Sequence, residues 1–220
     1  MINILHFDKD IIVCEKPTGI LSQADSSGGK NLPDELKKQT NSYYVEAVHR
    51  LDRPVGGVMV YARNKTAAGK LSADVASKKF DKEYLAVVSG KPEAESGEYT
   101  DYLFKDTAHC RSYAVKTLRK GAKEAKLSYK VLGTAEYEGN TLTLVSVRLF
   151  TGRTHQIRVQ FSSRGMPLAG DGKYGSKINC DLALRSHEIS FTHPRTGERM
   201  TFSSEPPAKF PWTLNWRTDK

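Results

Sequence analysis

The sequence predicts an α+β fold with a mixed, largely antiparallel central sheet and flanking helices and loops. Two observations lead to this prediction. First, alternating apolar residues dominate the middle of the chain, as in residues 141–150, where every second side chain falls on one face of a strand. Second, helical spacing is confined to short stretches, and strands and helices follow one another in mixed order without an internal repeat.

Periodicity and turn-forming residues place the individual elements. Apolar residues at helical spacing predict one helix over 66–80 and another after Gly152, and a short helix over 34–40 begins after Pro33. The turn-forming stretches 119–123 and 194–197 each predict a β-hairpin between the strands beside them. The expected strands span residues 11–13, 58–62, 84–88, 111–118, 126–132, 141–150, 190–192 and 200–202.

The composition is that of a soluble chain, and its 220 residues fit one large domain or two small ones. No stretch approaches the roughly 20 apolar residues that span a bilayer. The first residues lack the basic start and apolar run of a signal peptide. Cys14, Cys110 and Cys180 are far apart, which argues against a disulfide framework and for a reducing compartment. We therefore expect a cytoplasmic protein.

The net charge of +9 indicates an acidic partner, and the charge is unevenly distributed. Between residues 111 and 130 there are seven bases and one acid, a net local charge of +6. Bases that neutralise phosphates release counterions, so this stretch is typical of a nucleic-acid contact. A solvated hairpin that its charges merely keep soluble explains the pattern equally well. The bases are Arg111, Lys116, Arg119, Lys120, Lys123, Lys126 and Lys130.

Three polar segments lie among apolar neighbours, and the first is residues 49–57. In this segment Asp52 stands between Arg50 and Arg53, which would favour its ionised form. The pair Gly56–Gly57 helps to predict a tight turn, which would hold Asp52 on a rigid loop. For an isolated aspartate in this setting, however, a turn-forming or ion-pairing role is the more common one.

The other two segments also carry side chains suited to chemistry. Tyr84 begins the strand 84–88, where a phenol more often belongs to the core with its hydroxyl at the rim. Residues 151–160 join a strand to a helix and place arginines, a histidine and a glutamine beside a helix N-terminus, which favours anions. A capped helix with an exposed basic face accounts for that spacing equally well.

The sequence gives little support for a metal or a nucleotide cofactor. Its six histidines lack the i, i+4 pairing or cysteine spacing of a zinc site, and it contains neither a Walker loop nor a G-x-G-x-x-G stretch. Cys110 follows His109, but a thiol nucleophile needs a base beside it in space rather than in sequence. We therefore expect neither metal nor cofactor, and a Cys/His hydrolase is a minor alternative.

In their order and spacing, these segments resemble the RluA family of RNA pseudouridine synthases. Residues 49–52 (HRLD) are similar to the family's most specific motif, and residues 152–158 (GRTHQIR) to its third motif. Residues 82–86 (KEYLA) resemble the segment that carries its active-site tyrosine. Residues 14–19 and 167–171 add supporting matches, so the resemblance covers nearly the whole chain.

The chain departs from the family pattern in two places. Many relatives carry Thr-Ser-Gly where this chain has Val55-Gly56-Gly57, and both sequences preserve a turn. Many relatives also carry a small N-terminal RNA-binding domain, for which this chain has no room. We therefore expect residues 1–220 to form a single catalytic domain, with the pseudouridine synthase fold around a catalytic cleft, that recognises RNA by itself.

The resemblance implies a cofactor-independent isomerase that converts specific uridines of ribosomal RNA, transfer RNA or both into pseudouridine. Asp52 would be the catalytic carboxylate. Burial alone can raise the pKa of an aspartate by up to about 3–5 units, so Arg158 would keep it charged in a dry pocket. Tyr84 would stack on the uracil and help to remove the proton from carbon 5, and Ile157 would form an apolar wall.

The resemblance also implies how RNA is held. Arg50 would fill the space that the target uridine leaves when it flips out of its stack. Further substrate contacts are implied for His49, Arg153, His155 and Gln156. Gripping of the RNA backbone is expected of Arg111, Lys116, Arg119, Lys120 and Lys123. The family implies a monomer that acts on structured RNA without a membrane or an obligate protein partner. An RNA-binding or chaperone module that has lost catalysis is the remaining alternative.

Overall fold

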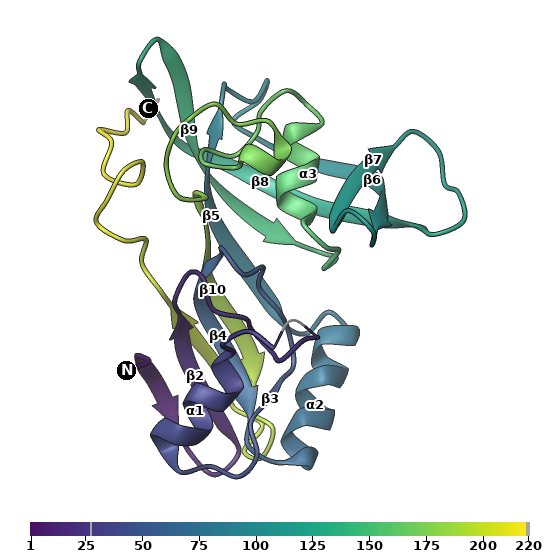
Figure 1. The fold of residues 1–220 in the computed structure, drawn as a ribbon, viewed down its shortest axis with the longest axis vertical. Helices are drawn as coiled ribbons and strands as arrows, with labels where there is room; N and C mark the ends of the chain where they lie inside the picture. The colour runs from purple at the N-terminus through teal and green to yellow at the C-terminus, as the bar shows by residue number, and fades with distance from the viewer. Residues whose placement is uncertain (27, 219–220) are drawn as a thin grey trace. The chain divides into compact units, whose positions relative to one another are not determined.

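The computed structural model describes residues 1–26 and 28–218, and Ser27, Asp219 and Lys220 lie outside this description. The chain divides into two compact units (Figure 1). Unit 1 comprises Met1–Glu83 and Arg185–Pro206, and unit 2 comprises Tyr84–Leu184 and Pro207–Lys220. The expectation of one catalytic domain over residues 1–220 stays a prediction. No helix of the described residues is long and apolar enough to cross a bilayer.

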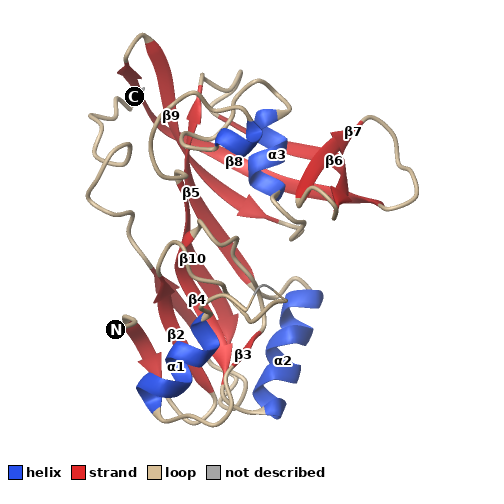
Figure 2. Ribbon diagram, viewed as in Figure 1, coloured by secondary structure: helices blue, strands red, loops and turns tan. Residues whose placement is uncertain are grey.

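Unit 1 is a sheet with two helices. Its strand order is β1-β2-β4-β10, with β11 beside β10 and β3 beside β4, and β4 and β10 run parallel whereas the other pairs are antiparallel (Figure 2). Its elements are β1 (Ile4–Phe7), β2 (Ile11–Lys16), α1 (Leu32–Thr40), β3 (Glu46–Ala47), β4 (Gly56–Ala62), α2 (Lys65–Ala76), the start of β5 (Asp81–Ser89), most of β10 (Leu184–Thr192) and β11 (Arg199–Ser203). The predicted hairpin around residues 194–197 is confirmed as β10–β11.

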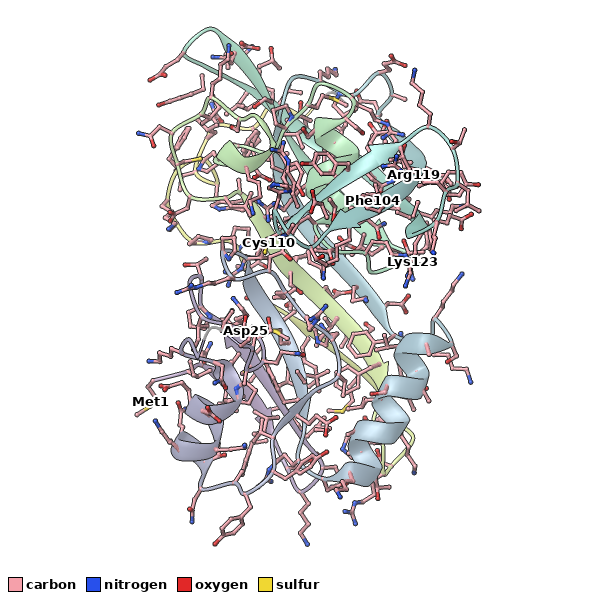
Figure 3. The ribbon with its side chains drawn as sticks, turned by 45° about the vertical axis from the view of Figure 1, so that its right-hand side comes forward. Met1, Asp25, Phe104, Cys110, Arg119 and Lys123 are labelled. Carbon is pink, nitrogen blue, oxygen red and sulfur yellow. The ribbon has the colours of Figure 1, made fainter. Side chains whose placement is uncertain are left out.

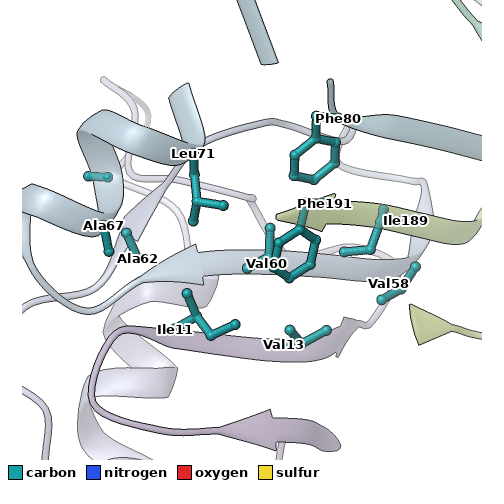
Figure 4. Close-up of a cluster of buried hydrophobic side chains, with 11 residues drawn as sticks. Ile11, Val13, Val58, Val60, Ala62, Ala67, Leu71, Phe80, Ile189 and Phe191 are labelled. Carbon is teal, nitrogen blue, oxygen red and sulfur yellow. The ribbon is translucent and has the colours of Figure 1, made fainter. Parts of the chain in front are cut away.

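The core of unit 1 lies between its sheet and α2 (Figure 4). All residues of β4 are buried, as a central strand covered on both faces requires. Leu71 of α2 packs into the same cluster as Phe80 and Phe191, whose rings stack with centroids 5.6 Å apart. The predicted helix over 66–80 therefore ends too late: Phe80 belongs to the core just before β5, and the chain leaves the helix at Lys78, which has a φ of 61°.

Unit 2 is a sheet with one α-helix against it, and its pairs β9–β8, β8–β6 and β6–β7 are antiparallel. Its strand order is β5-β9-β8-β6-β7. Its elements are β5 from Tyr84 onward, β6 (Ser96–Asp106), β7 (Arg111–Val115), β8 (Ala122–Tyr137), β9 (Asn140–Leu149), α3 (Gln156–Ser162) and a short 3₁₀ helix (Gly172–Tyr174). Six of the seven residues of α3 are buried, which fixes this helix firmly on the sheet.

The hairpin predicted around residues 119–123 is wrong. The strands on either side of it, β7 and β8, do not pair with each other, because β6 lies between them and pairs with both. Lys116, Arg119 and Lys120 therefore belong to a crossover segment, which we call the β7–β8 connection (residues 116–121), whereas Lys123, Lys126 and Lys130 lie on β8. The predicted α+β class, with a mixed and largely antiparallel sheet, is confirmed.

Gly56 and Gly57 also play a different part from the one predicted, because they begin β4 rather than form the turn. A Cβ atom on Gly57, whose φ is +125°, would lie 2.2 Å from the backbone oxygen of Ser186 on β10. Such an approach is far inside van der Waals contact, so only glycine allows the two backbones to pair here. Gly57 therefore sets the spacing of β4 and β10.

We expect Gly57→Ala to lower the free energy of unfolding by at least about 2 kcal/mol, because the new methyl group forces β4 and β10 apart. Gly69→Ala is the matched control: nothing lies within 4 Å of a Cβ atom at this helical position, so alanine should stabilise by about 0.5–1 kcal/mol. Urea denaturation of both variants measures these differences. A Gly57→Ala variant as stable as the unsubstituted chain would contradict the close approach.

Candidate active site

The predicted catalytic aspartate stands at the start of a hydrogen-bonded turn in unit 1. The amide of Val55 donates to the backbone oxygen of Asp52 at 2.9 Å, which closes the turn over Arg53 and Pro54. The residue before it is also fixed, because the hydroxyl of Ser22 exchanges hydrogen bonds with both backbone groups of Leu51, at 2.8 and 3.0 Å. Asp52 is thus half-buried on a backbone with little freedom.

The buried side chain of Lys16 is hydrogen-bonded to the backbone of this turn. The Lys16 side chain, at the end of β2, is 1% exposed. Its ammonium donates hydrogen bonds to the backbone oxygens of Pro17, Arg53 and Val55, at 3.0, 3.2 and 2.8 Å. Three acceptors match the three donors of an ammonium. Lys16 therefore ties the end of β2 to both sides of the Asp52 turn.

Burial lowers the pKa of Lys16 to about 8, because removal from water disfavours the charged form. The negative charge of Asp52 opposes this decrease. The charge of Asp52 therefore favours the ammonium form of Lys16 within unit 1. Arg53 adds a further tie: Gly19 and Arg53 exchange backbone and side-chain hydrogen bonds at 2.8 and 2.9 Å.

The first residue of the HRLD segment, His49, is buried in the core of unit 1. His49 is 7% exposed, its Nε2 accepts a hydrogen bond from the amide of Val60 at 3.2 Å, and its ring lies 5.1 Å from that of Phe80. Burial lowers the pKa of His49 to about 3, helped by the nearby charge of Lys82, so the imidazole is neutral. This geometry favours a packing role over the predicted substrate contact. Arg50, by contrast, is exposed.

In unit 2 the segment before α3 is held by its own side chains. The side-chain oxygen of Gln156 accepts hydrogen bonds from the Thr151 hydroxyl at 2.8 Å and the Arg153 amide at 3.0 Å, and its amide group donates to the backbone oxygen of Lys126. The exposed side chain of Arg153 donates to the backbone oxygen of Glu124 at 2.8 Å. Gln156, 3% exposed, therefore shapes the turn into the helix.

Arg158 and Asp171 form a buried two-point ion pair in unit 2. The arginine Nε donates to one carboxylate oxygen at 2.7 Å and Nη2 to the other at 2.8 Å, with the side chains 7% and 1% exposed. The guanidinium also lies 5.1 Å from the centre of the Tyr174 ring. Such a fork-to-fork pair fixes the direction of the guanidinium plane as well as its position. Arg158 is therefore oriented by its own unit.

His155 is positioned by the same tyrosine. The hydroxyl of Tyr174 accepts a hydrogen bond from the amide of Ser112 at 2.9 Å and lies 2.8 Å from Nδ1 of His155. These two contacts fix the hydroxyl of Tyr174 between the Ser112 amide and the imidazole of His155. Tyr84 and Ile157 are 6% and 4% exposed, on β5 and α3.

The predicted site residues thus fall into two groups. His49, Arg50 and Asp52 lie in unit 1, and the remaining catalytic and substrate-binding candidates lie in unit 2. Sequence reasoning missed Lys16, Asp171 and Tyr174 as supports of these groups. The first two stand in the segments 14–19 and 167–171, whose family match was the available signal. Their partners could not be read from it.

A further charged cluster lies in unit 1, where Asp8, Asp10 and His193 each place one possible metal ligand within 4.8 Å of the others. Both oxygens of Asp10 accept hydrogen bonds from Arg195, at 2.5 and 2.9 Å, and Nε2 of His193 lies 3.0 Å from Asp8. Burial opposes ionisation of Asp8, yet hydrogen bonds from His6 and the backbone lower its pKa to about 2. These contacts account for the cluster as an ion-pair network.

We expect Lys16→Met to lower the free energy of unfolding at pH 7, because three carbonyl oxygens lose their donor at about 1–3 kcal/mol each, partly offset by removal of a buried charge. The effect should depend on pH. The folded pKa of about 8 lies below the ordinary 10.5, so between these values the unfolded chain binds more protons. As the pH increases from about 8 to 10.5, the free energy of unfolding of the unsubstituted chain should therefore rise relative to that of Lys16→Met, by up to about 1.4 kcal/mol per pH unit.

Urea denaturation at several pH values between 7 and 10.5 measures this difference. Lys38→Met, at an exposed position of α1, is the control and should follow the unsubstituted chain at every pH. Parallel stability profiles for Lys16→Met and the unsubstituted chain would contradict a buried, titrating ammonium under the Asp52 turn.

Comparisons with known proteins identify the family. Residues 10–163 match the family described as RNA pseudouridylate synthase. The chain is 35% identical to an uncharacterized RNA pseudouridine synthase of Aquifex aeolicus, over 98% of this chain and 72% of that protein. It is 34% identical to tRNA pseudouridine synthase C of Haemophilus ducreyi, over 92% and 90% of the two chains. It is 30% identical to the dual-specificity RNA pseudouridine synthase RluA of Pasteurella multocida, over 93% of each chain.

Solved structures show the same fold. The human RNA pseudouridylate synthase domain containing 1 protein superposes with a TM-score of 0.79 at 22% identity, covering 96% of this chain and 85% of that one. The human domain containing 4 protein gives a TM-score of 0.77, also at 22% identity, covering 96% and 91%. The resemblance seen in the HRLD and GRTHQIR segments is therefore confirmed: the chain belongs to the RNA pseudouridine synthase family.

Proposed function

We propose that this chain converts specific uridines of ribosomal RNA, transfer RNA or both into pseudouridine, with Asp52 as the catalytic carboxylate. The observation that carries this proposal is the anchoring of the Asp52 turn by the Lys16 ammonium. A turn that served only to connect two strands would not need a buried charge beneath it, since burial of an ion costs several kcal/mol. Rigid support is what a reacting carboxylate requires.

The reaction is an isomerisation. The bond from ribose carbon 1′ to uracil N1 breaks, the base turns, carbon 5 bonds to carbon 1′, and the proton of carbon 5 is lost while N1 gains one. No electrons are exchanged with a partner, so neither an oxidant nor a reductant is consumed. Asp52 acts at the sugar, either by attack on carbon 1′ or by removal of a proton from carbon 2′, and both steps need its ionised form.

Arg158 and Tyr84 supply the remaining chemistry in this proposal. Arg158 maintains the charge of Asp52 during the reaction, and its two-point pair with Asp171 supports this role because it fixes the guanidinium before substrate binds. Tyr84 stacks on the uracil and assists removal of the proton from carbon 5. Ile157 contributes an apolar wall that retains the detached base.

RNA recognition is proposed for exposed residues. Arg50 and Arg153 are exposed, as substrate contacts should be, and Arg50 is suited to fill the gap left by a flipped base because a planar guanidinium can stack. His155 is half-buried, with its Nδ1 held 2.8 Å from the Tyr174 hydroxyl. The buried residues His49 and Gln156 act indirectly, through the turns that they support. We further propose a cytoplasmic monomer.

The relatives support ribosomal and transfer RNA as the candidate substrates. Among them are a tRNA pseudouridine synthase, ribosomal large subunit pseudouridine synthases and a dual-specificity enzyme. The dual-specificity enzyme aligns over 93% of its length with 93% of this chain. Pseudouridine mapping of total RNA from cells with and without this gene would identify the target uridines.

We expect Asp52→Asn and Asp52→Ala to slow pseudouridine formation by at least about 100-fold, because they remove the reacting carboxylate. Binding of the same RNA should change by less than about 3-fold, or roughly 0.6 kcal/mol. The measurement is pseudouridine content of RNA from gene-deleted cells after incubation with each purified variant. Asp74→Asn, a half-buried aspartate of α2, is the control.

Two alternatives predict different results. If the chain only binds RNA, the unsubstituted protein will form no pseudouridine in any RNA. If it is a Cys/His hydrolase, Cys110→Ser will remove its activity, whereas we expect that variant to be fully active. Cys110 is exposed on the turn between β6 and β7. Full activity of Asp52→Ala would exclude Asp52 from the mechanism.

We also propose that the bases around the β7–β8 connection contact RNA phosphates. Lys116, Lys120 and Lys123 are exposed, and their replacement by alanine should reduce the slope of log K against log salt by about 2–3. The control variant replaces Lys9, Lys38 and Lys65, three exposed lysines of unit 1, and changes the net charge equally. Equal slopes for the two triple variants would favour a solvated segment without an RNA contact.

A further inference from the structure

One face of the β6–β7 pair carries aromatic side chains. Phe104 on β6 and Tyr113 on β7 are direct register partners, so their side chains project from the same face of the sheet. The neighbouring residue Leu103 projects from the other face and packs with Val159 of α3 and with Tyr174. The face that bears Phe104 and Tyr113 is therefore the one directed away from α3.

The two rings differ in their exposure. Tyr113 is 41% exposed, with the guanidinium of Arg111 5.5 Å from its ring centre. Phe104 is half-buried beneath the β7–β8 connection, and the guanidinium of Arg119 lies 4.9 Å from its ring centre (Figure 3). A Cβ atom on Gly121 would lie 3.2 Å from Cε2 of the same ring. The connection therefore crosses this face over Phe104 and leaves the ring of Tyr113 accessible beside it.

The charge around this face is positive. The exposed bases Lys116, Arg119 and Lys120 lie on the crossing segment, and Arg111 shares the face of Tyr113. The acids Asp106 and Glu124 are on the same face, so the bases outnumber the acids there. Lys123, the register partner of Leu103, projects from the other face. A flat accessible ring among cations is complementary to a nucleotide, which has an aromatic base and an anionic phosphate. Such a ring is less suited to a protein partner, because a protein surface presents a flat aromatic group beside an anion far less often than a nucleotide does.

We propose that Tyr113, with Phe104 and Arg119 beside it, forms a stacking platform for an unpaired nucleotide of the RNA substrate. The proposal rests on the proposed function for the identity of that RNA. The nucleotide must be unpaired, because the bases of an A-form helix are already stacked on one another. Any base has a π-face, so the platform holds a single-stranded segment near the target without reading its sequence.

The test uses the full-length chain and fluorescein-labelled RNA: a 12-nucleotide single strand of adenines, a 12-nucleotide single strand of uridines, and a 12-base-pair duplex. We expect Tyr113→Ala to weaken binding of both single strands about 5- to 150-fold, the range for loss of one stacked base. Duplex binding and the salt slope should stay unchanged. Fluorescence anisotropy measures all three affinities.

Tyr113→Phe keeps the ring and should bind single strands as tightly as the unsubstituted chain, whereas Tyr113→Leu keeps an apolar side chain and should bind as weakly as Tyr113→Ala. Tyr43→Ala removes a 96% exposed tyrosine of unit 1 and should have no effect. The adenine strand contains no uridine, so its binding is independent of pseudouridine formation. The effect of Tyr113→Ala on this strand therefore tests the platform even if the chain forms no pseudouridine. Unchanged single-strand binding by Tyr113→Ala, or equal losses for strand and duplex, would overturn the platform.

Discussion

The ammonium of Lys16 is the constraint on which the Asp52 turn depends. A cation that is 1% exposed is tolerated only where acceptors replace its water, and here three backbone oxygens do so. Because two of those oxygens belong to Arg53 and Val55, the lysine cannot keep its hydrogen bonds unless the turn keeps its shape. The position of the Asp52 carboxylate therefore depends on the hydrogen bonds that Lys16 makes at the buried end of β2.

In the second group of site residues the supporting charge is negative, because a buried carboxylate, that of Asp171, orients the guanidinium of Arg158. Arg158 is an arginine of a largely buried helix, and the carboxylate of Asp171 compensates its charge. Buried ion pairs add little net stability, because desolvation offsets most of the attraction. What they provide is direction, since a fork-to-fork pair has one favourable geometry. In both units, then, a buried charge fixes the geometry around a residue for which we propose a catalytic role.

The sequence was informative where the signal is local. Contiguous motif residues identified the Asp52 turn and the approach to α3, and β4, β9 and the β10–β11 hairpin follow their periodicity and turn residues. Contacts between distant segments could not be predicted. Lys16 and Val55 are 39 positions apart, and the need for glycine at Gly57 appears only when β10 pairs with β4. Burial of His49 and Gln156 likewise depends on neighbours that the motif does not name.

The missed strand β6 shows how such a failure matters for function. Residues 96–106 mix charged, aromatic and polar side chains without a clean alternation, so the basic stretch after β7 was interpreted as a simple hairpin. Because β6 lies between β7 and β8, that stretch must instead cross β6. It runs from Val115, which pairs with Tyr102, to Ala122, which pairs with Phe104. The crossing brings Arg119 onto Phe104, the register partner of Tyr113. Charge and aromatic surface meet here because of strand order, which no local pattern encodes.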